Sequence, residues 1–297
     1  MTTDTALGYD VFVLDPSPLT GSGPLPNGEP RRYQPIAVTL VHGRQDAVLV
    51  DPPLTTEQAQ RVGDWVEASG KRLTHIVATH GHGDHWFTAE TLAERFGAQV
   101  VASAGTIEQM HGNVSARELL WDVMWPDQIP VTAVTAETVP GNRLTLEGHD
   151  LGLVEVGHAD SDDCTVVHVP DLGLVVAGDV IYNGVHLYLG DAAAGEFGPW
   201  RKAIDTVAAL QPSRIVASHQ NKDLDDDAGR VIAETRQYLD DAEAVLAKQT
   251  TAEGFFAAML ERHPDRLGRT VLWVSARALY FAREGDDPWQ TLMAAWL

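Results

Sequence analysis

The stretch ATHGHGDHWF, residues 78–87, places three histidines and one aspartate within six positions. These four residues are His80, His82, Asp84 and His85. The hydrophobic residues before them predict a strand at 74–79, and Gly81 and Gly83 predict a loop whose backbone can wrap around an ion. Neutral imidazoles and carboxylates are the usual protein ligands for zinc and related metals. The stretch therefore predicts a metal site at the end of a buried strand.

The number of ligands in this cluster indicates two metals. Asp84 and His85 are adjacent, so they cannot easily share one metal with both preceding histidines. Further ligands are expected where other strands end. Three potential ligands each follow an apolar run: His158 after LGLVEVG, Asp179 after LGLVVAG and His219 after SRIVAS. Together they favour a site built from several strand ends.

The order of predicted elements indicates a layered α/β core with a helical appendage. Strands are predicted at 9–15, 33–43, 46–52, 74–79, 98–103, 143–147, 151–156, 164–169, 173–178 and 213–219. Helices are predicted at 55–70, 86–96, 104–112, 199–210, 227–248, 252–262 and 268–283. The irregular stretch 113–142 contains Trp121 and Trp125, which are interpreted either as part of a lid or as core aromatics. We expect a catalytic domain over 1–225 and a helical region over 226–297 packed on it.

The composition excludes several classes of protein. The 297 residues include 21 Lys+Arg against 42 Asp+Glu, a net charge of −21, which argues against binding to nucleic acids or anionic membranes. The N-terminus lacks the features of a signal peptide, and no apolar run of about 18 residues predicts a membrane span. Cys164 is the single cysteine, so no intrachain disulfide forms, and we expect a packed thiol. These features predict a cytoplasmic globular protein.

The pattern T-H-x-H-x-D-H, followed by G-H, G-D and a late S-H, resembles the metallo-β-lactamase superfamily of binuclear metallohydrolases over residues 35–222. The resemblance implies a four-layer αββα sandwich with two zinc ions, or other divalent metals, in a groove at one edge. It implies one metal on His80, His82 and His158, a second on Asp84, His85 and His219, and Asp179 bridging them. Asp51, at the end of AVLVD, matches an aspartate that in the family usually supports the ligands.

The implied reaction is hydrolysis by a hydroxide that bridges the two metals and attacks an acyl carbon. Asp84 is the candidate for proton transfer. In having an aspartate at position 179, the sequence resembles thioesterases, lactonases and phosphodiesterases. Zinc β-lactamases commonly have Cys or Ser in this region. Tyr182 matches the tyrosine that helps to bind the substrate carbonyl in acyl-homoserine lactonases.

The residues around the predicted site favour a neutral small-molecule substrate. The candidate substrate-binding residues are Trp86, Tyr182, His186 and Tyr188. A lactone or carboxylic ester fits this setting best. Thioester hydrolysis is second, because a glutathione thioester requires cationic side chains, which RHPDRLGR (262–269) could supply.

Four further functions are weaker alternatives, namely a β-lactamase, a phosphodiesterase, an iron persulfide dioxygenase and a non-catalytic binding protein. The faces of 227–248 suit packing either on the core or on a second copy of the chain, so a homodimer is also compatible with the sequence.

Overall fold

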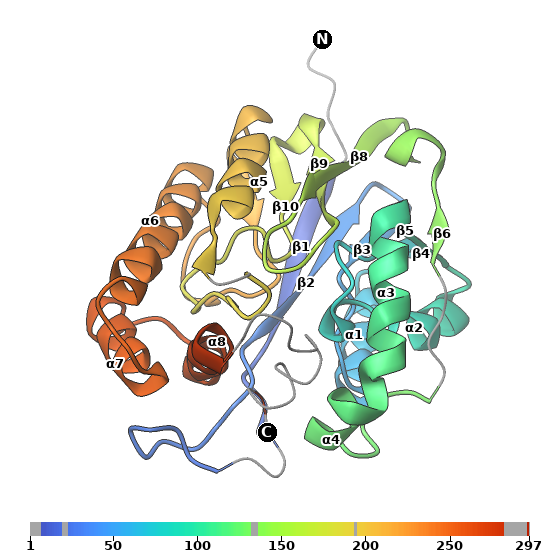
Figure 1. The fold of residues 1–297 in the computed structure, drawn as a ribbon. Coiled ribbons are helices and arrows are strands. Elements are labelled where there is room, and N and C mark those ends of the chain that lie inside the picture. The colour runs from blue at the N-terminus through green and yellow to red at the C-terminus, as the bar shows by residue number, and fades with distance from the viewer. Residues whose placement is uncertain (1–6, 20–22, 132–135, 193–194, 282–295, 297) are drawn as a thin grey trace.

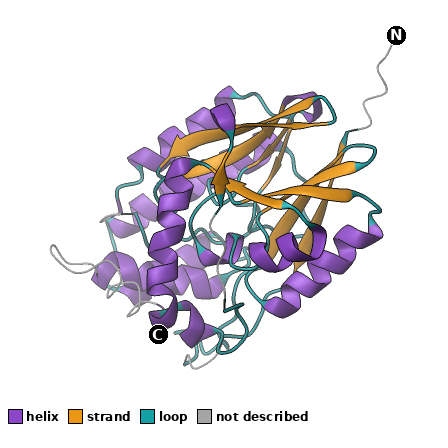
Figure 2. Ribbon diagram, turned by 90° about the vertical axis from the view of Figure 1, so that its right-hand side faces the viewer, coloured by secondary structure: helices purple, strands orange, loops and turns teal. Residues whose placement is uncertain are grey.

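The computed structural model describes residues 7–19, 23–131, 136–192, 195–281 and 296. Two mixed sheets lie between two sets of helices (Figures 1 and 2). The first sheet has the order β1-β2-β3-β4-β5-β6, and the second has the order β11-β10-β9-β8-β7. Helices α1 to α4 lie on one side of the strands in Figure 1, and α5 to α8 lie on the other.

The bounds of these elements are as follows. The first sheet contains β1 (Gly8–Leu14), β2 (Ile36–His42), β3 (Asp46–Val50), β4 (Arg72–Val77), β5 (Gln99–Ala102) and β6 (Glu137–Thr138). The second contains β7 (Arg143–Leu146), β8 (His149–Gly157), β9 (Cys164–Val169), β10 (Leu174–Val176) and β11 (Arg214–Val216). The helices are α1 (Thr56–Ala68), α2 (Ala89–Phe96), α3 (Ala104–Ala116), α4 (Trp121–Met124), α5 (Gly198–Ala209), α6 (Ala228–Leu246), α7 (Ala252–Arg262) and α8 (Arg269–Phe281).

Alternation of side chains along the strands creates three apolar cores, and hence four layers. In β3, Leu49 packs toward helices α1 and α2, while Val48 and Val50 pack between the two sheets. In β10, Val175 packs toward the helices of the second sheet, while Val176 packs between the sheets. The αββα architecture expected from the sequence is therefore confirmed.

The structure differs from the predicted elements at the bounds of two helices, and it adds α4 and β6 within the stretch 113–142 that was expected to be irregular. The helix expected from 86 begins at Ala89, because Gly83–His85 form a 3-10 turn and Trp86 donates its indole N–H to the Gly81 carbonyl, 2.8 Å away. The helix expected to end at 112 continues to Ala116. Parts of two predictions, 132–135 of the irregular stretch and 282–283 of the last helix, lie outside the described residues. Within the described residues, no helix is both long and apolar enough to cross a membrane.

The direction of the strands places several loops at one edge of the sandwich. Strands β3 and β4 are parallel in the first sheet, and β10 and β11 are parallel in the second. Strand β8 runs in the same direction as β10, because each is antiparallel to β9. The segments that follow these five strands carry the polar residues described next.

Candidate metal centre

Asp51 ties together loops from both sheets. It follows β3 and accepts hydrogen bonds from the Thr79 backbone N–H and hydroxyl, both at 2.8 Å, after β4. It also accepts a 2.5 Å hydrogen bond from the Ser218 hydroxyl, after β11. The residue is completely buried, and its φ of 56° lies in the left-handed region. These bonds hold the loops that carry the histidines against each other.

A glycine makes the close approach of a third loop feasible. Gly178 follows β10 with a φ of 53°, and a Cβ at this position would lie 2.4 Å from the Thr79 hydroxyl oxygen. Both the backbone conformation and the contact therefore require glycine. The Gly-Asp sequence brings Asp179 beside the histidine loop.

The histidine rings are oriented by contacts to the nitrogen that faces away from the centre of the site. His80 Nδ1 lies 3.1 Å from the Thr79 hydroxyl, and His219 Nδ1 lies 2.7 Å from the Pro35 carbonyl. His85 Nδ1 lies 3.4 Å from Asp51 Oδ2. Such contacts fix ring orientation in metal sites and leave the other nitrogen for the metal.

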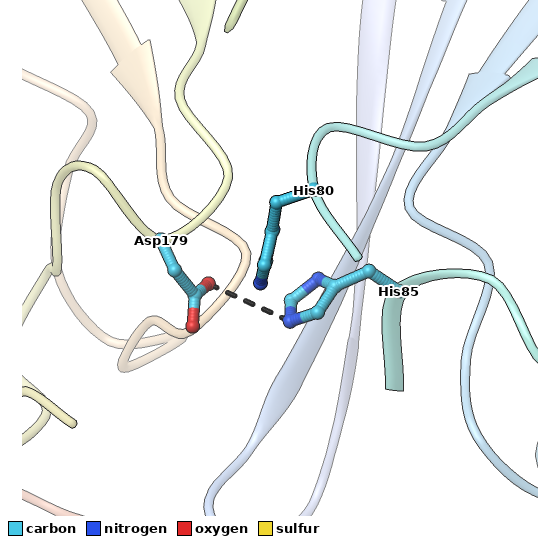
Figure 3. Close-up of side chains that lie close together, drawn as sticks. All are labelled: His80, His85 and Asp179. Carbon is cyan, nitrogen blue, oxygen red and sulfur yellow. Dashed lines mark ion pairs between the residues drawn. The ribbon is translucent and has the colours of Figure 1, made fainter. Parts of the chain in front are cut away.

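Among the described residues, three groups of side chains could each hold a metal ion. They are His80, His82 and Asp160; His80, His85 and Asp179; and Asp84, His85 and His219. The middle group is drawn in Figure 3, where the three side chains point toward one another. Within the part of the chain that the structure describes, His80 Nε2, Asp160 Oδ2, Asp179 Oδ1 and both ring nitrogens of His85 are buried and have no hydrogen-bond partner. A buried polar atom without a partner destabilises the folded state. These nitrogen and oxygen atoms are therefore suited to coordinate metal ions that the groups share.

The charges within the site attract cations. Burial alone lowers the pKa of His219, but Asp179 and Asp84 outweigh this effect and raise the pKa to about 10. Burial likewise opposes protonation of His85, but the same two carboxylates raise its pKa to about 9. For Asp84, burial favours the neutral form, yet His85 and His219 hold its pKa below the usual value. Protons and metal ions compete for the same nitrogens in such a cluster.

A comparison with protein families identifies the scaffold. Residues 32–219 match the metallo-beta-lactamase superfamily, which is more than half of the chain. The chain belongs to the metallo-beta-lactamase superfamily. Its match to the superfamily and its His/Asp groups together support a metal-dependent hydrolase.

Individual relatives of the metallo-beta-lactamase superfamily are distant. The chain is 27% identical over 146 residues to a hydroxyacylglutathione hydrolase from Rhizobium meliloti (strain 1021), covering 48% of this chain and only 46% of that protein. It is 28% identical over 185 residues to a UPF0173 metal-dependent hydrolase from Thermofilum pendens, and this match covers 60% of this chain and 75% of that protein. A crystal structure of a beta-lactamase domain protein from Burkholderia ambifaria has a TM-score of 0.60 at 16% identity, covering 91% and 85%. That last likeness concerns the fold alone.

The structure departs from the ligand set implied by the superfamily at one position. His158 belongs to none of the three groups found among the described residues. Its Nδ1 lies 2.7 Å from Asp162 Oδ1, and its side chain is 23% exposed. Asp160, which the sequence analysis did not select, is completely buried, with Oδ2 at 3.0 Å from His82 Nδ1 and 3.6 Å from His80 Nε2. Gly157, in the left-handed region with φ 82°, turns the chain after β8 so that Asp160 rather than His158 faces the site.

Two predicted substrate-binding residues, Trp86 and His186, are buried and contact residues outside the three candidate metal groups. Trp86 is buried in the core against Phe87, with ring centroids 4.7 Å apart. His186 is buried with its Nδ1 3.0 Å from the Tyr238 hydroxyl. Both side chains are held within the interior by other parts of the fold, and their contact with a substrate stays a prediction.

The two predicted tyrosines contact the ligand groups. The Tyr182 hydroxyl donates to Asp179 Oδ2 at 2.7 Å, so it holds a ligand carboxylate in place. Its contact with a substrate carbonyl stays a prediction. The Tyr188 ring lies 5.7 Å from the His82 ring, and its hydroxyl donates to Asp191 Oδ1 at 3.1 Å. The other oxygen of Asp191 lies 3.3 Å from His82 Nε2.

Tyr33 is a further residue of the site that the sequence analysis missed. Its hydroxyl donates to Asp84 Oδ2 at 2.8 Å, and its ring packs edge-on against Trp125 at 4.8 Å. Trp125 and Trp121 are both buried in the core, which favours the core interpretation of these two residues. No local motif marks Tyr33, because it lies 51 positions before the carboxylate that it contacts.

Proposed function

We propose that this chain is a binuclear zinc hydrolase that opens a lactone or a carboxylic ester. Two metals are supported by the composition of the three groups. The group with Asp160 and the group with Asp84 share no residue, whereas the middle group takes one histidine from each and adds Asp179. This is the arrangement expected of two metals with one carboxylate between them.

The bound metals would supply a nucleophile at neutral pH and polarise the carbonyl of the substrate. The side chains of the protein hold and orient the acidic groups around that carbonyl. Tyr182 donates to Asp179, and Tyr33 donates to Asp84, so both carboxylates have fixed positions. Asp84 is ionised at neutral pH and is our candidate to accept a proton from the attacking water, although His85 and His219 lower its pKa and so weaken it as a base. It can then return this proton to the leaving oxygen.

The single observation that carries the substrate proposal is that tyrosine hydroxyls contact the candidate ligand carboxylates, and that the charged neighbour of His82 at the exposed end is another carboxylate, Asp191. The side chains that hydrogen-bond to the ligand carboxylates include Tyr33 and Tyr182, and the His82 ring packs against Tyr188. Two divalent cations would carry four positive charges, which three candidate ligand carboxylates and a bridging hydroxide balance. The cations would stabilise the single oxyanion of an ester or lactone, but the neutral site and its tyrosines offer no counterpart for a polyanionic substrate.

A substrate screen on zinc-loaded protein tests this proposal. The panel contains γ-lactones, p-nitrophenyl acetate, S-lactoylglutathione, nitrocefin and bis(p-nitrophenyl) phosphate. We expect kcat/KM for the best lactone or ester to exceed that for the thioester at least about tenfold, equivalent to about 1.4 kcal/mol. His85→Ala, which removes a ligand from two groups, is the inactive control. A higher kcat/KM on nitrocefin or on the phosphodiester would overturn the proposal.

Thioester hydrolysis is the second candidate function. The observation that favours it is the similarity to a hydroxyacylglutathione hydrolase, although the match covers less than half of that protein. The same panel separates the two candidates. Preferential hydrolysis of S-lactoylglutathione by the wild type, abolished in His85→Ala, would establish the second function in place of the first.

A further inference from the structure

Aromatic rings connect the two ends of the metal centre. The Tyr33 ring lies 6.3 Å from the His219 ring and 5.8 Å from the Trp296 ring. The Trp296 ring is stacked on Tyr188 at 6.3 Å, and Tyr188 lies 5.7 Å from His82. We call Tyr33, Trp296 and Tyr188 the aromatic arch. Its middle member is the second-to-last residue of the chain.

The exposure of the ligands shows where a substrate can reach them. The side chains of His80, Asp160, Asp84, His85, Asp179 and His219 are at most 3% exposed. His82 is 17% exposed, and Asp191 beside it is 36% exposed. The open end of the site is therefore at His82, where Tyr188 and Trp296 of the arch lie.

The arch is held in a defined position. The hydroxyl groups of Tyr33 and Tyr188 donate to Asp84 and Asp191, which orients their rings. The Arg31 guanidinium donates to the backbone carbonyl of Trp296 at 2.8 Å. All three arch residues are 6% exposed or less, so the Trp296 indole is fixed between two oriented tyrosines.

We propose that Trp296 is a specificity-determining residue, whose indole forms the wall that contacts the apolar part of the substrate. The proposal rests on the proposed function. A carbonyl group held at the buried ligands leaves the rest of the substrate to extend toward the open end at His82. There it meets Tyr188 and Trp296. The preferred substrates are therefore lactones or esters that carry an extended hydrocarbon group, and not their short homologues.

A pair of lactones tests the proposal: γ-butyrolactone, and γ-nonalactone, which carries a pentyl chain. We expect the wild type to prefer γ-nonalactone. Trp296→Leu should lower kcat/KM for γ-nonalactone about tenfold, mainly by raising KM. The reason is that the pentyl chain loses its contact with the aromatic ring and buries less apolar surface. It should change kcat/KM for γ-butyrolactone by less than about twofold. Arg31→Gln leaves every ring in place but removes the hydrogen bond to the Trp296 carbonyl. It should also lower kcat/KM for γ-nonalactone relative to γ-butyrolactone.

Trp273→Leu is the matched control, because Trp273 is also a buried tryptophan but packs against Phe256 in the helical core. It should leave the ratio of the two lactones unchanged, and metal content should be unchanged in all variants. An equal loss for both lactones in Trp296→Leu, or no preference for γ-nonalactone in the wild type, would overturn the proposal.

A binding experiment separates failure of this inference from failure of the proposed function. Calorimetric titration of the zinc-loaded protein with nonanoate and with acetate measures the same apolar contact without catalysis. If neither lactone is hydrolysed, the proposed function fails. The inference still holds if the wild type prefers nonanoate and Trp296→Leu loses that preference. It is wrong if the two proteins show the same preference, or if the wild type shows none.

Discussion

Replacing Asp160 by asparagine should remove one metal from the protein, whereas replacing His158 by glutamine should not. Asp160 Oδ2 is completely buried, has no hydrogen-bond partner and lies 3.0 Å from His82 Nδ1. His158 is partly exposed and pairs with Asp162. The two variants therefore separate Asp160, which the structure places in a candidate metal group, from His158, the ligand implied by the superfamily resemblance.

The expected magnitude follows from the role of Asp160 as a direct ligand. Loss of a group that only supports a ligand typically weakens metal affinity about 10- to 100-fold. Loss of a charged ligand should weaken it at least about 100-fold, equivalent to about 2.7 kcal/mol. The variant should still fold, because burial raises the pKa of Asp160 and already favours a neutral group there. Asparagine also preserves the shape of the side chain beside Cys164.

The assay is metal stoichiometry by mass spectrometry after dialysis against chelator-buffered zinc. At a free zinc concentration at which the wild type and His158→Gln hold two metals, Asp160→Asn should hold one. The thermal midpoint of Asp160→Asn should also rise less on addition of zinc, because ligand binding to the folded state stabilises it. Loss of a metal in His158→Gln with full occupancy in Asp160→Asn would refute this assignment.

Three other predictions concern single residues. Asp179→Asn removes the negative charge of the group formed by His80, His85 and Asp179, so activity should fall at least about tenfold even with excess zinc. An unchanged rate and an unchanged metal content would show that Asp179 has only a structural role. Tyr182→Phe removes the donor to Asp179 and the hydroxyl predicted to bind the substrate carbonyl, so zinc affinity should fall about tenfold and kcat at saturating zinc about 5- to 100-fold. Full kcat at saturating zinc would limit the role of the hydroxyl to holding Asp179. Glu147 accepts hydrogen bonds from three backbone N–H groups, which lower the pKa of its carboxyl from 4.5 to about 2. Its ionised form should therefore stabilise the folded state fully above pH 4.5, and this stabilisation should disappear as the pH falls toward 2. The difference in thermal midpoint between the wild type and Glu147→Gln should narrow over this range, and a constant difference would contradict the prediction.

The ligands in strand-end loops could be predicted from the sequence because two strong local signals coincide there. Apolar runs identify β4, β10 and β11, and histidine or aspartate follows each run directly. Strands that run in the same direction end at the same edge of a sheet, so such residues meet. The His80 loop, Asp179 and His219 accordingly come together in the structure.

The choice between His158 and Asp160 could not be made from local sequence. The segment GHADSDD after β8 offers several potential ligands within seven positions. Which of them faces inward depends on the irregular pairing between Glu155 and Gly157 and on the left-handed conformation at Gly157 and Asp163. A shift of one residue in such a turn redirects every following side chain. The sequence shows the presence of ligands here but not the direction of each.

For the aromatic residues, closeness to the histidine motif in the sequence does not predict closeness to the site in the structure. Trp86 is adjacent to His85 in sequence, yet it is buried in the core, because it follows the 3-10 turn Gly83–His85 and its indole N–H donates to the Gly81 carbonyl. Tyr33 and Trp296 lie far from the histidine motif in the chain, yet their rings are parts of the arch beside the ligands. Histidine and carboxylate clusters are rare enough to be recognised by chemistry alone, whereas aromatic residues are common in every core. The residues that we propose to contact substrate are therefore found by long-range packing, whereas most candidate metal ligands are found from local pattern.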